Sequence, residues 1–181
     1  MNKIKLKIIG TIIAFILSFV IHNLYVYIPN IITSIIAPVN ESIWEHMKLL
    51  FTSILIAGVI QKLIVINKKL DINNVCISNF TGALLSIPLF LIIYTPIYNK
   101  IGKNFTITII IMLIVIIISE YISYKIMNSK KLNMENHAII FTIIVYIIFF
   151  ILTIYPPHNN IFLDPITNKY GIIIDKKWKT N

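Results

Sequence analysis

Five apolar stretches, each of about 20 residues or a little more, alternate with short polar segments along the chain. A backbone in hydrocarbon must satisfy its own hydrogen bonds, so a stretch of this length predicts a transmembrane helix. The runs are rich in β-branched residues but lack the period-2 alternation of a half-buried strand. We therefore predict an all-α integral membrane bundle of five helices that forms one domain over 1–181. The expected spans are 8–28, 42–66, 77–97, 105–127 and 137–155.

Lysine placement predicts how these helices cross the membrane, because short cytoplasmic loops carry an excess of basic residues. The segments that precede the first stretch and follow the second and fourth hold three, two and two lysines, seven in all. The two loops on the opposite side hold two. We therefore predict an N-terminus inside and a C-terminus outside, with residues 156–181 as an extracytoplasmic tail. The first stretch is too long for a signal-peptide core and meets no cleavage site, which predicts a retained signal-anchor.

Composition supports a membrane protein and excludes several other classes. Apolar residues make up 57% of the chain and charged residues 13%, with a mean hydropathy of +0.86. Soluble domains run at ~45–50% apolar and ~25% charged, so an ordinary soluble enzyme or a disordered chain does not fit. Lysine alone supplies the positive charge behind the net charge of +9, and the chain contains no arginine. Arginine is the residue that binds phosphates and bases in a bidentate way, so we expect no nucleic-acid partner. Cys76 is the single cysteine, which excludes an internal disulfide.

The chain has few acidic residues and histidines, and several of them lie at the predicted outer face. The second span opens there with Pro38-Val39-Asn40-Glu41-Ser42-Ile43-Trp44-Glu45-His46. One explanation is structural: Ser42-x-x-Glu45 fits a capping box, and Glu45 with Lys48 forms an i,i+3 pair. A second explanation is a site, because Glu41 and Glu45 share one helix face and His46 lies on the adjacent one.

The segment after the fifth span carries the other polar groups of this face. Pro156 and Pro157 end the helix sharply, and the turn residues around Asp164 alternate with apolar ones. This pattern predicts a tail that folds back onto the helices. His158 and Asp164 would then reach the start of the second span.

Two strings within these segments, Pro-Val-Asn-Glu-Ser-x-Trp-Glu-His over 38–46 and Tyr-Pro-Pro-His through Asp-Pro-x-Thr-x-x-Tyr-Gly over 155–171, carry a family resemblance. The chain resembles a family of small multi-pass bacterial membrane proteins of unknown function over nearly its whole length. The resemblance implies a location in the bacterial cytoplasmic membrane and brings no activity with it.

The polar residues leave three functions open, and whether the chain is an enzyme stays undecided. The first is a binding or regulatory protein with a polar site on the outer face and a lipid headgroup, a membrane-protein partner or a second copy as its partner. The second is a hydrolase that depends on a divalent metal ion. Candidate ligand-binding residues are Asn40, Glu41, Glu45, His46, His158 and Asp164; candidate metal ligands are His22, Glu45, His46, His158 and Asp164; candidate catalytic residues are Glu41, Glu45 and His46.

The third function is a small transporter that acts as an oligomer. It depends on Glu120, because an acid within a span is a functional candidate by default. The competing interpretation is that Glu120 forms an ion pair with Lys125 or Lys62.

Overall fold

The computed structural model describes residues 1–172, and every regular element of two residues or more within them is a helix. Residues 173–181 of the expected outer tail lie outside the described part. The helices are α1 (Lys3–Tyr27), α2 (Ile31–Ile36), α3 (Ile43–Asn67), α4 (Val75–Ile101), α5 (Phe105–Met127) and α6 (Glu135–Ile154). Five of the six are long and apolar enough to cross a membrane. At 1.5 Å per residue they measure about 30–40 Å, enough for a ~30 Å hydrocarbon core. The predicted all-α bundle of five spans is confirmed.

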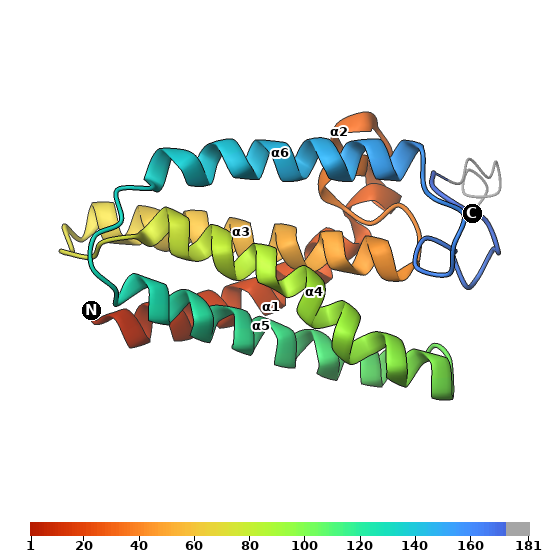
Figure 1. Ribbon diagram of the computed structural model, residues 1–181, viewed down its shortest axis with the longest axis horizontal. Coiled ribbons are helices and arrows are strands. Elements are labelled where there is room, and N and C mark those ends of the chain that lie inside the picture. Colours follow the sequence, from red (N-terminus) through yellow and green to blue (C-terminus); the bar gives the residue numbers. More distant parts are fainter. Residues whose placement is uncertain (173–181) are drawn as a thin grey trace.

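The five long helices run alternately up and down the length of the molecule (Figure 1). One end of the bundle carries the beginning of α1, and we call it the N-terminal end. The other carries the segment 155–172, and we call it the tail end. An odd number of crossings places these two parts of the chain at opposite ends, while the assignment of either end to the cytoplasm stays a prediction.

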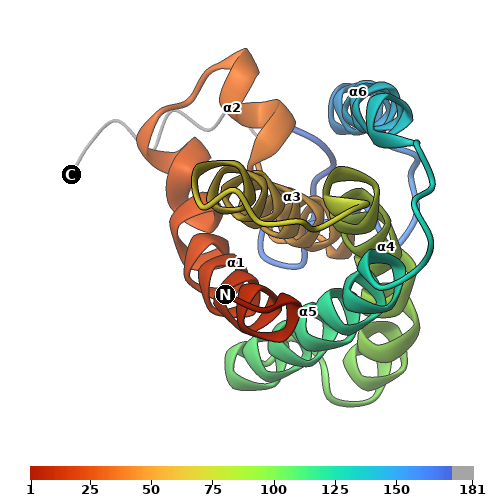
Figure 2. The ribbon, with the colours of Figure 1, turned by 90° about the vertical axis from the view of Figure 1, so that its left-hand side faces the viewer.

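Helix α3 is the centre of the bundle, as the view along the helices shows (Figure 2). It packs against α1, α4 and α5 and contributes more buried residues than any other helix. Phe51 shows this central position, since its ring contacts Phe80 of α4 and both Tyr146 and Phe149 of α6. Helix α6 is the most exposed of the five, so many of its apolar residues would face the lipid of a bilayer.

The boundaries of three helices differ from the expected spans by two residues or more. Helix α1 begins at Lys3 rather than at residue 8, because the Asn2 side chain caps it by accepting from the amide of Lys5 at 2.9 Å. Helix α4 extends beyond 77–97 at both ends and α6 begins two residues early, whereas α5 matches its prediction. The short α2 was not expected, and a reciprocal cap between Asn30 and Thr33 starts it.

The tail folds back onto the bundle, as predicted. The amide of Trp44 donates to the carbonyl of Ile161 at 3.0 Å, and the Trp44 ring stacks on Phe162. The Asn40 side chain donates to the carbonyl of Gly171 at 2.9 Å. The tail therefore covers the loop that begins α3 and holds it in place.

Candidate functional site

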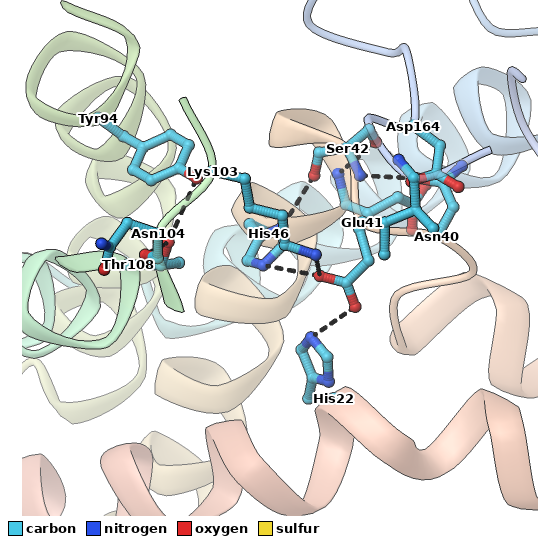
Figure 3. Close-up of polar contacts among 12 residues, drawn as sticks. His22, Asn40, Glu41, Ser42, His46, Tyr94, Lys103, Asn104, Thr108 and Asp164 are labelled. Atoms are coloured by element: carbon cyan, nitrogen blue, oxygen red, sulfur yellow. Dashed lines mark hydrogen bonds and ion pairs between the residues drawn. The ribbon is translucent and has the colours of Figure 1, made fainter. Parts of the chain in front are cut away.

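Three polar side chains from three segments meet at the tail end of the bundle (Figure 3). His22 comes from the end of α1, Glu41 from the loop before α3, and His46 from the first turns of α3. Nε2 of His22 lies 3.3 Å from Oε1 of Glu41, and Nε2 of His46 lies 3.8 Å from Oε2 of the same carboxylate. One ligand atom from each residue falls within 4.8 Å of the others. We call these residues the His-Glu-His site.

Local capping explains why the chain presents Glu41 and His46 to each other. The amide of Ser42 donates to Oδ1 of Asn40 at 2.9 Å, which fixes the loop immediately before the helix. The amide of Glu45 donates to Oγ of Ser42 at 3.3 Å, so Ser42 is the predicted N-cap. The second half of the predicted capping box is wrong: Oε2 of Glu45 accepts from the amide of Val39 rather than reaching back to Ser42.

The imidazole of His46 has one defined tautomer at its contact with Ser42. Its Nδ1 lies 2.9 Å from the carbonyl oxygen of Ser42, and because a carbonyl only accepts, Nδ1 carries the hydrogen. The ring is 6% exposed and stacks on Phe90 with an interplanar angle of 10°. Nε2 is thereby directed at Glu41 and is left with its lone pair whenever the ring is neutral.

Glu41 is held in its ionised form by positive and hydrogen-bonding neighbours. The hydrogen bond from His22, with a further one from Lys103, lowers the pKa of this carboxyl to about 2 against the opposing effect of burial. Nζ of Lys103, in the loop between α4 and α5, lies 3.0 Å from Oε2. The site therefore presents a carboxylate and not a carboxylic acid at neutral pH.

A cavity of about 400 Å³ borders the His-Glu-His site. Its polar end contains His22, Glu41, His46 and Lys103. Its remaining wall comes mainly from apolar residues of α1, α3 and α5, namely Phe15, Phe19, Leu49, Phe105, Ile109 and Met112, together with the polar residues Ser18, Asn23 and Thr108. This size and this mixture of apolar walls with a few converging polar groups are typical of a ligand pocket.

Glu45, predicted as a catalytic and ligand residue, points away from this cavity. Its carboxylate forms an ion pair with Lys48 at 2.6 Å and accepts from Thr153 of α6 at 3.3 Å. Nζ of Lys48 also donates to the carbonyl of Ser34 at 2.7 Å. Both charged side chains are buried, so the pair joins α2, α3 and α6, which is the i,i+3 pair that the sequence suggested.

The two tail residues predicted for the site, His158 and Asp164, build the tail instead. The exposed ring of His158 stacks on Tyr170, with centroids 4.6 Å apart. The carboxylate of Asp164 accepts from the amide of Ile166 and the hydroxyl of Thr167. Over residues 1–172, the grouping of histidines, cysteines and acids close enough to share a metal ion is the His-Glu-His site alone.

A second polar cluster, which the sequence analysis missed, lies within the spans toward the N-terminal end. Nζ of Lys7 lies 3.0 Å from Oε2 of Glu120. It also donates to the side-chain oxygens of Gln61, Asn79 and Ser123, so that α1, α3, α4 and α5 meet at one ammonium group. We call these five residues the lysine cluster.

The predicted pairing of Glu120 with Lys125 or Lys62 is therefore wrong. Lys125 lies over the ring of Tyr121, one turn before it, and Lys62 pairs with Glu135 at 3.5 Å. Glu120 occupies the face of α5 that packs against α1, which neither of those lysines reaches.

Glycines in the spans allow the close approach that the lysine cluster requires. A Cβ at Gly10 would lie 1.5 Å from the amide nitrogen of Gln61, and one at Gly58 would lie 2.6 Å from Cβ of Asn79. Small residues within the spans are the signal in the sequence that could have indicated this cluster, because they allow neighbouring helices to approach closely.

Two imidazoles and a carboxylate form a donor set that suits a divalent metal ion. Zinc in catalytic sites takes the His₂Glu combination and leaves one position open. Tetrahedral ligands around zinc lie about 3.4 Å from one another, given bonds of ~2.0–2.1 Å. The observed separations of 3.3 and 3.8 Å, which join the histidines to different oxygens of the Glu41 carboxylate, approach this value.

The fold and the site together define a class: a multi-pass helical membrane protein with a histidine–carboxylate site at one end. A family model described as a family of unknown function (DUF6512) matches residues 1–172. The chain belongs to this family. No curated protein and no solved structure matches the chain.

Proposed function

We propose that this membrane protein is a binding protein that holds a divalent metal ion, of the zinc class, at the His-Glu-His site. The observation that carries the proposal is the convergence of His22, Glu41 and His46 from three segments within 4.8 Å. A second support for the proposal is that a backbone carbonyl already orients one of the two histidines, His46, as is usual for metal-binding histidines.

The hydrogen-bonding pattern of the site also favours a cation. With Nδ1 of His46 donating to Ser42, the neutral ring turns the lone pair of Nε2 toward a carboxylate oxygen. Two acceptors that face each other repel unless a proton or a metal ion lies between them. Lys103 supplies one positive charge to Glu41 and is partly exposed.

We place this site on the outer face of the membrane, since the lysine count predicts the tail end outside. Lys7 no longer belongs to that count, because it lies inside the bundle. Six lysines against two still favour the same orientation.

The test is a zinc titration of the full chain, purified in detergent and stripped with a chelator that is then removed. We expect one zinc per chain, and loss of that binding in Glu41→Gln and His22→Ala, whose side chains are partly exposed and whose replacement leaves the core intact. His158→Ala and His137→Ala are the matched controls, because both histidines lie outside the site and should keep full stoichiometry. Zinc binding that is absent, or that survives both site variants, would contradict the proposal.

A metal-dependent hydrolase is the second candidate, and one observation favours it. Three protein ligands leave a position open for water, and the 400 Å³ cavity borders the same residues. In this candidate His22, Glu41 and His46 hold the metal. Lys103 lies near enough to bind an anionic substrate group, and Glu45 takes no part. Turnover of an ester or phosphoester by the zinc-loaded wild type, lost in Glu41→Gln, would select the enzyme over the binding protein.

The transporter hypothesis gains no support, because the Glu120 charge on which it depends is already neutralised by Lys7.

A further inference from the structure

The cavity at the His-Glu-His site opens between two helices that draw apart. Helices α1 and α5 are joined toward the N-terminal end by the Lys7–Glu120 pair and by Lys3, whose Nζ donates to the carbonyl of Met127. Toward the tail end they separate, as the view along the bundle shows (Figure 2). Residues from both helices line the cavity there, so it is a cleft between α1 and α5 with α3 as its floor.

The walls of this cleft are amphipathic along its length. Phe19 of α1 and Phe105 of α5 line it and are 43% and 73% exposed, so its apolar side reaches the surface that faces lipid. The polar groups form a polar extremity at the tail end of the cleft, where Glu41, Lys103 and the two histidines lie and where Phe105 begins α5. A metal ion alone occupies only that polar extremity and leaves the apolar walls without a partner.

Charge defines the kind of group that completes the polar extremity. A divalent ion held by Glu41 together with Lys103 leaves two positive charges in excess, since the carboxylate cancels only one. The ammonium of Lys103 pairs with the carboxylate that would also hold the metal, so it competes with the metal for Glu41 and would be released for another anion when the metal binds. Lysine binds phosphate well as a point charge, and phosphate oxygens also suit the open position of a metal.

We infer that the cleft binds a membrane lipid with a phosphate headgroup, an inference that rests on the proposed metal site. The phosphate lies on the open position of the metal and on Lys103, and the acyl chain lies between α1 and α5 against Ile109 and Met112. Free phosphate uses the polar extremity alone, whereas an uncharged lipid leaves the excess positive charge uncompensated. Metal and lipid then raise each other's affinity by the same factor, because coupling between two ligands is reciprocal.

The experiment measures binding of monododecyl phosphate to the zinc-loaded full chain, with inorganic phosphate and dodecanol as comparison probes. We expect monododecyl phosphate to bind at least about tenfold more tightly than either, since burial of two methylene groups or one charged contact is enough for that factor. Lys103→Gln should weaken this binding by about tenfold, and zinc should bind more tightly when monododecyl phosphate is present.

A matched pair of variants tests the apolar part of the cleft. Ile109→Trp fills the wall of the cleft, whereas Ile110→Trp adds the same ring to the neighbouring residue, which is 51% exposed and lines no part of it. We expect the first to reduce binding of monododecyl phosphate by tenfold or more and the second to leave it unchanged. Both should keep one zinc per chain, because neither touches the His-Glu-His site.

The outcomes separate the inference from the proposal beneath it. One zinc per chain with equal affinity for inorganic and dodecyl phosphate would overturn the lipid and assign the cleft to free phosphate. Equal effects of the two tryptophan variants would overturn the acyl site. Absence of zinc binding would overturn the proposed function, and lipid binding that persists without zinc and in Glu41→Gln would overturn the link between metal and headgroup.

Discussion

The lysine cluster and the His-Glu-His site both surround a carboxylate with side chains from several helices, yet they differ in how complete they are. In the lysine cluster, Glu120 has a full counter-charge in Lys7, and both are almost fully buried. Gln61 and Asn79 supply the remaining donors and acceptors. At the His-Glu-His site, Glu41 is about a quarter exposed, and the lone pair of one imidazole faces it.

This difference separates a group that holds the fold together from one that is ready to bind. A buried ion pair that satisfies all its hydrogen bonds needs nothing from outside and resists change, since removing one partner strands the other. A carboxylate beside a cavity, with a neighbouring nitrogen acceptor, can exchange its present partners for a cation. The five residues of the lysine cluster therefore serve stability, whereas binding is the role that we propose for the three of the His-Glu-His site.

The strongest test of this contrast is Lys7→Met, which leaves Glu120 without its counter-charge. We expect a loss of about 3–5 kcal/mol in the free energy of unfolding, measured by denaturant titration in detergent micelles. The double variant Lys7→Met with Glu120→Leu removes both charges and should recover most of that loss. A single variant as stable as the wild type would show that the lysine cluster does not hold the helices together.

Gly10→Ala tests the close approach of α1 to α3. Its new Cβ meets the Gln61 amide at a distance that no packing tolerates, so the amide must move and the cluster loses a contact. We expect a loss of about 1–3 kcal/mol by the same titration. Adding Gln61→Ala makes room and should restore part of it, whereas a double variant no more stable than Gly10→Ala would place the strain elsewhere.

A smaller effect is expected where the tail meets the loop before α3. Asn40→Ala removes hydrogen bonds to Gly171 and Ser42. Each is worth about 0.5–1.5 kcal/mol, and part exposure of these groups favours the lower values. Limited proteolysis of residues 155–172 should become faster while the thermal unfolding of the helices changes little. Unchanged proteolysis would mean that the Trp44 contacts alone hold the tail.

The smallest stability effect is expected at the His-Glu-His site itself. Without metal, Glu41→Gln should change the free energy of unfolding by less than about 1 kcal/mol, because partly exposed ion pairs contribute little. With zinc at 100 times its dissociation constant, the wild type should gain about 2.7 kcal/mol, and Glu41→Gln should gain none. A large loss in the metal-free variant would erase the distinction between the two clusters.

The spans were predictable because length and hydropathy alone decide which segments cross a bilayer. Helix α5 is the clearest example, since its apolar run is bounded by Asn104, whose side chain caps the helix, and by a polar loop after Met127. The inside or outside position of each end rests on lysine counts and stays a prediction.

The candidate site was predictable in part, because antiparallel neighbouring spans bring the end of one beside the start of the next. This rule places His22 near Glu41 and His46. It could not distinguish Glu41 from Glu45, four residues later, because that difference depends on Lys48 and Thr153 meeting Glu45 on the other side of α3. His158 and Asp164 shared the correct end, but the turns of the tail direct them into the tail itself.

The lysine cluster escaped prediction for a different reason. A lysine close to the N-terminus of a span is ordinarily expected to extend its side chain to the membrane surface. Lys7 turns inward instead, because Gly10 lets α1 approach Gln61 and because Asn79 and Ser123 converge from two other helices. Such a coincidence of four helices is a property of packing and not of any one segment.

The distance along the chain between Lys7 and Glu120 has a consequence for biosynthesis. The first helix leaves the ribosome more than a hundred residues before the acid that neutralises its lysine, so during synthesis α1 enters the bilayer with an unpaired charge. Until its partners arrive, a lysine so close to the end of a helix keeps its ammonium group at the membrane surface, because burial of an unpaired charge costs free energy. Helix α1 can therefore reach its final position only after α5, the fourth long helix, has been synthesised. A nascent chain that stops before α5 should leave α1 easier to extract from the membrane.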